Sequence, residues 1–118
     1  MEGRNLKVGI ELYFDSMHLL PGHPMCGVPH GHTYKVEVVV EGPVQNGMVI
    51  DFGELKSHAK EVIARFDHKN LNEFLQMPSC ENIASFIHRE LSNRLPQMSK
   101  VQIRVWEGNA KFAECDGT

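Results

Sequence analysis

The chain has 118 residues, of which 42% are hydrophobic and 23% charged, and its formal net charge is −3 with seven neutral histidines. These values fit one globular domain over residues 1–118 and argue against a basic nucleic-acid-binding surface. No apolar run approaches the roughly 20 residues that span a membrane, and no signal-peptide pattern opens the chain. Three widely spaced cysteines favour a reducing cytoplasm. We therefore expect a cytoplasmic protein whose partners include neither nucleic acid nor a membrane.

Two segments of alternating polarity near the N-terminus predict β-strands. Val8, Ile10 and Leu12 alternate with polar residues within 6–14, and a second alternation covers 33–41. The stretch between them is rich in proline, glycine and histidine, which predicts a loop over residues 15–31.

The middle of the chain predicts two helices. Asp51 and Glu54 have the spacing of a capping box, and helical apolar spacing continues from there to Phe66. A second helix is expected to begin at Pro78-Ser79.

The C-terminal part predicts two more strands, at residues 100–106 and 111–115. The resulting order β-β-α-α-β-β predicts an α+β fold, an antiparallel four-stranded sheet with two helices on one face. The other face is charged, and the open sheet edges favour pairing with further copies of the chain.

Residues 18–32 contain four of the seven histidines. His30 and His32 are two positions apart, so on a strand they point to the same face. If the second strand begins early, that face is its apolar one. With a third nitrogen from upstream they would form a metal site, and imidazole suits zinc among other divalent ions. Cys26 either lies beside an open centre or closes it as a fourth ligand.

Six short motifs follow one another along nearly the whole chain: Phe14-x-x-x-His18, Cys26-x-x-x-His30-Gly31-His32, Asp51-Phe52-x-Glu54-Leu55-Lys56, Asp67-His68-x-x-Leu71-Asn72, Pro78-Ser79-x-Glu81-Asn82 and Val105-x-Glu107. Together they resemble the pyruvoyl-tetrahydropterin synthase family, which includes 6-carboxytetrahydropterin synthase. The resemblance implies the tunnelling fold (T-fold), in which three sheets close into a twelve-stranded barrel. Two such trimers would stack into a homohexamer, with active sites where subunits meet.

The resemblance also implies a zinc-dependent lyase that acts on a small molecule, 7,8-dihydroneopterin triphosphate. The implied zinc ligands are His18, His30 and His32, with one position left for substrate. Cys26 would transfer a proton as a thiolate, which a nearby metal favours by lowering its pKa. Asp67 and His68 of a neighbouring subunit would form the partner acid–base pair. Without the resemblance, the sequence at these two residues indicates the end of a helix.

Three further residues would hold the pterin. A carboxylate at Glu107 could accept two hydrogen bonds from the 2-amino and N3–H edge of the ring. Ser79 and Cys80 would lie beside the ring, and Ser79 could also cap the second helix. On residue type alone, Glu107 is equally a solvated charge at a strand end.

The residues and the resemblance leave three enzymatic activities and one non-catalytic function open. The three residues between Cys26 and His30 favour 6-carboxytetrahydropterin synthase, of the queuosine and archaeosine deazaguanine pathway, which releases triphosphate and acetaldehyde. The alternatives within the family are 6-pyruvoyl-tetrahydropterin synthase, which eliminates triphosphate, and sepiapterin side-chain cleavage. The alternative of another class is a non-catalytic zinc module in which His18, Cys26, His30 and His32 close around the metal.

Overall fold

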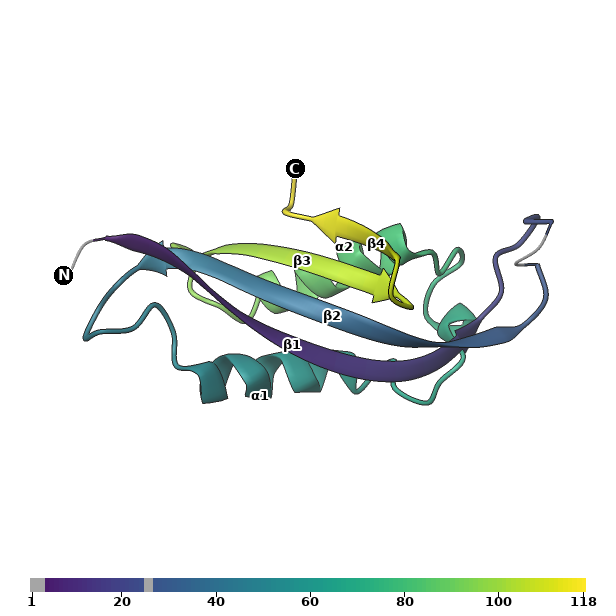
Figure 1. The fold of residues 1–118 in the computed structure, drawn as a ribbon, viewed down its shortest axis with the longest axis horizontal. Coiled ribbons are helices and arrows are strands. Elements are labelled where there is room, and N and C mark those ends of the chain that lie inside the picture. The colour runs from purple at the N-terminus through teal and green to yellow at the C-terminus, as the bar shows by residue number, and fades with distance from the viewer. Residues whose placement is uncertain (1–3, 25–26) are drawn as a thin grey trace.

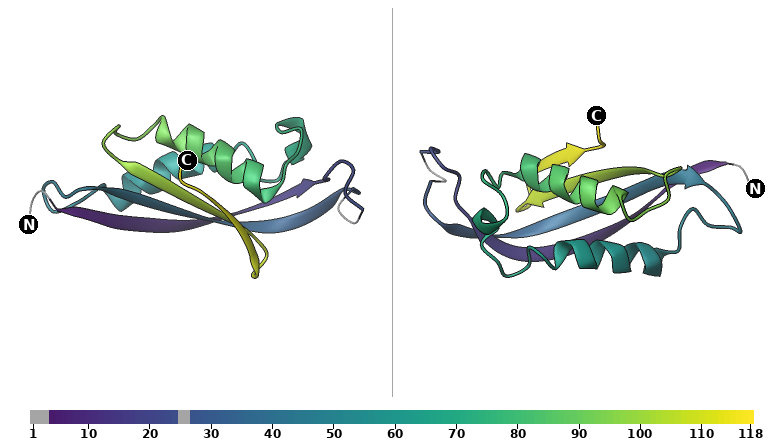
Figure 2. Two further views of the ribbon diagram at one scale, coloured as in Figure 1. Left: turned by 90° about the horizontal axis from the view of Figure 1, so that it is seen from above. Right: turned by 180° about the vertical axis from the view of Figure 1, so that it is seen from behind.

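A computed structural model describes residues 4–24 and 27–118. Its four strands form one antiparallel sheet in the order β1-β2-β3-β4, and both helices lie on the same face of that sheet (Figure 1, Figure 2). The elements in chain order are β1 (Asn5–His18), β2 (His30–Pro43), α1 (Phe52–Ile63), the 3-10 turn η1 (Leu71–Glu73), α2 (Cys80–Ser92), β3 (Lys100–Glu107) and β4 (Lys111–Cys115). The predicted fold class and element order are confirmed.

The hydrophobic core lies between the sheet and the helices. Alternate residues of each strand face the helices, as the polarity pattern predicts. Phe14 and Tyr34, opposite one another in β1 and β2, stack with ring centroids 4.8 Å apart. Leu55 from α1 and Ile87 from α2 are buried in the same core. The site described below lies at one end of this apolar face.

The first two strands are longer than predicted. Residues 15–18 belong to β1 and residues 30–31 to β2, so His18 pairs with His30 and Ser16 with His32. The prediction of a loop over 15–31 was wrong at both ends, and the connection between the strands covers 19–29.

A distant segment explains the extension of β1. Met17 N–H donates to the Lys69 carbonyl at 3.0 Å, and the Ser16 hydroxyl lies 2.9 Å from the Phe66 carbonyl, which it can donate to. Residues 66–70 thus support the edge of β1 more than fifty positions away, which local composition does not reveal.

The helix starts agree with the sequence, but one helix end does not. The Asp51 carboxylate accepts the Glu54 N–H at 3.0 Å, and the Ser79 hydroxyl accepts the Asn82 N–H at 3.2 Å. The first helix ends at Ile63, before Phe66, which lies in the following turn and is buried.

The face of the sheet away from the helices carries charged and aromatic side chains. Arg104 donates to the Glu114 carboxylate at 2.6 Å and lies 4.4 Å from the ring centroid of Phe112. Trp106 donates its indole N–H to Glu37 at 2.8 Å. Among the described residues, neither helix has the length and apolar character needed to cross a membrane.

Candidate metal centre

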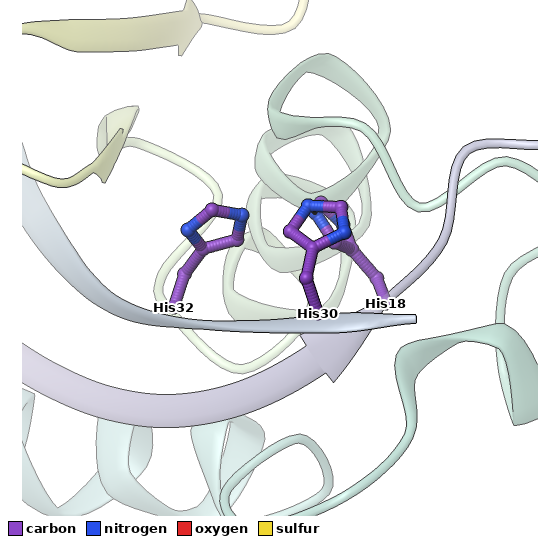
Figure 3. A group of neighbouring side chains, drawn as sticks. All are labelled: His18, His30 and His32. Atoms are coloured by element: carbon purple, nitrogen blue, oxygen red, sulfur yellow. Dashed lines mark hydrogen bonds between the residues drawn. The ribbon is translucent and has the colours of Figure 1, made fainter. Parts of the chain in front are cut away.

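Three histidines converge where β1 ends and β2 begins (Figure 3). His18, His30 and His32 each offer a ring nitrogen, and these nitrogens lie within 4.8 Å of one another. All three continue the helix-facing side of their strands, and His18 is almost fully buried. The extended β2 therefore places both histidines of the His-Gly-His motif on one face.

Backbone carbonyls fix the proton positions on two of these rings. Nδ1 of His18 lies 2.7 Å from the Pro78 carbonyl, and Nδ1 of His30 lies 2.8 Å from the Val28 carbonyl. A carbonyl only accepts, so each Nδ1 carries the proton and each Nε2 presents a lone pair. These two Nε2 atoms are 3.1 Å apart. Two lone pairs facing at this distance repel unless a cation lies between them.

The third histidine supplies independent support for a metal ion. Nε2 of His32 is buried and has no hydrogen-bond partner among the described residues, although buried polar atoms are nearly always satisfied. Burial lowers the pKa of His32, against the opposing effect of the Glu107 carboxylate. A neutral imidazole is the form that binds a metal. The donor set and its geometry thus fit a zinc ion.

The end of β1 is fixed by Asn72. Its side-chain amide binds both backbone groups of Leu19, accepting the N–H at 2.9 Å and donating to the carbonyl at 3.1 Å. The buried Tyr34 hydroxyl also lies 3.2 Å from Nδ1 of His18. Outer contacts of this kind orient metal ligands. Neither residue was predicted to have a role at the site, although Asn72 stands within the Asp67-His68-x-x-Leu71-Asn72 motif.

Glu107 faces the histidines from the end of β3. Its carboxylate oxygens lie 3.4 Å from Nε2 of His32 and 4.0 Å from Nε2 of His18. It follows Val101, Ile103 and Val105 on the helix-facing side of the strand. A cavity of about 410 Å³ opens beside it, lined also by Ser79 and Cys80. The structure therefore brings the three residues predicted to hold the pterin to one cavity next to the histidines.

Cys80 is poorly suited to nucleophilic chemistry. Burial raises the pKa of its thiol to about 12, and the Glu107 carboxylate, 3.8 Å from Sγ, adds to the effect. The thiol instead offers a weak hydrogen-bond donor to the carboxylate.

In the intact protein at pH 8, Cys80 is expected to react with iodoacetamide about thirtyfold more slowly than a cysteine in a short peptide. The thiolate fraction is far smaller, and the greater nucleophilicity of a high-pKa thiolate offsets only part of this loss. Peptide mass spectrometry after timed quenching measures the rate, and Glu107→Gln should increase it. Labelling as fast as the peptide would contradict the assignment.

Asp67 and His68 form a pair on the turn after α1. Nδ1 of His68 lies 3.0 Å from Oδ1 of Asp67, which also accepts the Asp15 N–H at 3.0 Å. His68 has a left-handed φ of 58° and its N–H donates to the Asp15 carbonyl. Such strain in a non-glycine residue is common at functional sites. The imidazole is 77% exposed, and His68 lines a second, open cavity that His32 also lines.

One predicted residue lies outside this geometry, and one residue of the cavity was not predicted. Cys26 lies outside the described residues, so neither its catalytic role nor its role as a fourth ligand is tested. Nothing in the sequence pattern singled out Lys111, whose Nζ lies 3.6 Å from Glu107 and which lines the same cavity.

This chain is similar to known proteins in sequence and in fold. The family model described as 6-pyruvoyl tetrahydropterin synthase matches residues 7–118. A solved 6-pyruvoyl tetrahydropterin synthase from Caenorhabditis elegans superposes with a TM-score of 0.89 over 100% of this chain and 99% of that one, at 21% identity. At that identity the superposition establishes the shared fold.

Three relatives are more similar in sequence. A candidate 6-carboxy-5,6,7,8-tetrahydropterin synthase from Archaeoglobus fulgidus is 44% identical over 108 residues, covering 91% of this chain and 92% of the relative. The dihydroneopterin monophosphate aldolase of Pyrococcus furiosus is 43% identical over 81 residues, 68% of this chain and 71% of the relative. The 6-carboxy-5,6,7,8-tetrahydropterin synthase of Haemophilus influenzae is 35% identical over 137 residues, covering 92% of this chain and 96% of the relative. The chain therefore belongs to the 6-pyruvoyl tetrahydropterin synthase family.

Proposed function

We propose that this chain is a zinc-dependent lyase that converts 7,8-dihydroneopterin triphosphate and one water molecule to 6-carboxytetrahydropterin, with release of triphosphate and acetaldehyde. The observation that carries the proposal is the convergence of three histidine nitrogens beside a cavity lined by Glu107. The extensive similarity to proteins named 6-carboxytetrahydropterin synthase supports this product.

The chain's own residues divide into a metal-binding and a ring-binding group. His18, His30 and His32 would hold zinc, which when bound would act as a Lewis acid toward the hydroxyls of the pterin side chain. Glu107 would accept the N3–H and 2-amino hydrogens of the ring and fix its orientation. Because Glu107 lies within 4.0 Å of two of the histidines, a ring held there places its side chain close to the metal.

Proton transfer would require groups beyond this cavity. We assign it to Cys26 and to the Asp67–His68 pair of a neighbouring subunit. The exposure of His68 agrees with action on another subunit. β1 and β4 are the edge strands of the sheet, where copies would pair to build the proposed cytoplasmic homohexamer.

Cys26→Ala is expected to retain zinc and to lower kcat about 100-fold, because general acid–base catalysis contributes on this scale. Zinc content by mass spectrometry and steady-state kinetics measure the two effects, with Cys115→Ala as the matched control. If the variant instead loses its zinc, Cys26 is a structural ligand and the closed-module alternative is correct.

The test of the reaction is product identification. Zinc-loaded protein is incubated with 7,8-dihydroneopterin triphosphate, and the products are identified by mass spectrometry. We expect 6-carboxytetrahydropterin and acetaldehyde. A pyruvoyl-tetrahydropterin product would assign the chain to the elimination reaction, and no conversion with zinc bound would favour a structural metal module.

A second candidate is aldol cleavage of a dihydroneopterin phosphate, favoured by the 43% identity to the Pyrococcus furiosus aldolase. The same metal and ring-binding residues would serve, since both reactions remove part of the pterin side chain. A hydroxymethyl pterin formed from 7,8-dihydroneopterin monophosphate, at a higher kcat/KM than the triphosphate reaction, would favour this activity.

A further inference from the structure

The Glu107 carboxylate lies between the histidines and one lysine. Its Oε1 atom is 3.4 Å from Nε2 of His32 and 3.6 Å from Nζ of Lys111. Its Oε2 atom faces Nε2 of His18 and the neutral thiol of Cys80. The same carboxylate oxygen, Oε1, is therefore near both a metal-binding histidine and Lys111.

Glu107 is close enough to the histidines to compete for the metal. Two ligands that share a tetrahedral zinc at bond lengths of about 2.0–2.1 Å are about 3.3 Å apart. The distance from Oε1 of Glu107 to Nε2 of His32 is 3.4 Å, and carboxylate oxygen is an ordinary zinc ligand. A carboxylate bound to the metal could not also receive the two ring hydrogens of a pterin, and it would occupy the position needed by the substrate.

Lys111 has the position and charge to oppose binding of the Glu107 carboxylate to the metal. It pairs with Glu107 directly across the hairpin of β3 and β4, whose turn passes through Gly108 at a φ of 69°. The other charged residues that line the cavity are Glu81 and Glu114, so Lys111 is the sole cation among the described residues there. Glu107 is only 16% exposed whereas Lys111 is 76% exposed, so solvent screens the ion pair in part.

We propose that Lys111 is a positioning residue that holds Glu107 out of the metal coordination sphere. It thereby keeps the fourth position open and the carboxylate available to the pterin ring. This inference rests on the proposed three-histidine metal site and adds to it a determinant of whether the site is open or closed.

The experiment uses full-length protein loaded with Co²⁺ and titrated with azide, which binds an open metal position and changes the visible spectrum. We expect Lys111→Met to weaken azide binding about fivefold, on the scale of one partly exposed ion pair, and to raise the affinity for Co²⁺. Lys111→Arg should retain wild-type values. Lys100→Met, at the opposite end of β3, is the matched control.

A double-mutant cycle separates positioning from simple attraction of an anion by a lysine. In a Glu107→Gln background the effect of Lys111→Met on azide binding should disappear, because the competing carboxylate is gone. An equal effect in both backgrounds, or none in either, overturns the inference while leaving the metal site intact. Failure of the wild-type protein to bind Co²⁺, or of its cobalt centre to bind azide, instead overturns the proposed open metal site.

Discussion

Replacing His32 with alanine is expected to lower the affinity for zinc about 100-fold or more and to abolish turnover. Even outer contacts to metal ligands contribute 10- to 100-fold to affinity, so loss of a ligand has at least that effect. The variant should fold, because His32 lies near the start of β2, is partly exposed and is not part of the hydrophobic core. The substitution removes Nε2, the buried atom that has no hydrogen-bond partner among the described residues.

Zinc affinity is measured by competition with a chelating dye, and turnover by product formation. His58→Ala is the matched control. His58 lies on α1, and among the described residues its one ion-pair contact is with Glu54. Unchanged zinc affinity in His32→Ala would show that the metal, if bound, is held elsewhere.

The second large effect is expected at Glu107. Glu107→Gln should lower kcat/KM about 1000-fold while leaving zinc bound, because a site built to hydrogen-bond its substrate is severely impaired by an unmatched polar group. Glutamine has one acceptor where the ring edge offers two donors, and its own N–H₂ would face a ring donor. The loss should fall mainly on substrate binding and orientation.

Binding of 7,8-dihydroneopterin, followed by fluorescence, tests this directly, alongside zinc content. Glu37→Gln on β2 is the control, since Glu37 accepts the Trp106 indole N–H on the sheet's other face and does not line this cavity. Pterin binding that survives Glu107→Gln would remove Glu107 from the ring-binding role, and loss of zinc would make it a metal ligand.

Local sequence patterns were sufficient to predict which side chains share the sheet face that carries the site. A period of two fixes which side chains share a face, so His30 and His32 could be placed beside Tyr34 before any coordinates. The same period places Glu107 on the face of Val101, a consequence of the third strand's alternation that the sequence analysis did not use.

Contacts between distant segments could not be predicted in this way. The extension of β1 to His18 depends on backbone bonds from residues 66–70, and the orientation of His18 depends on the Pro78 carbonyl sixty positions away. The pairing of Lys111 with Glu107 required knowledge of the hairpin register. The proposed action of Asp67 and His68 on a neighbouring subunit depends on assembly, which no local sequence pattern reveals.

In the proposed site, three histidines hold a metal with one position open toward a pterin bound by Glu107. The most direct measurement is a crystal structure of the zinc-loaded protein with 7,8-dihydroneopterin, with zinc located by anomalous scattering. We expect zinc on the Nε2 atoms of His18, His30 and His32, a fourth ligand from water or the pterin side chain, and Glu107 on the ring edge. Zinc enclosed by four protein ligands, or a pterin bound away from Glu107, would contradict the account.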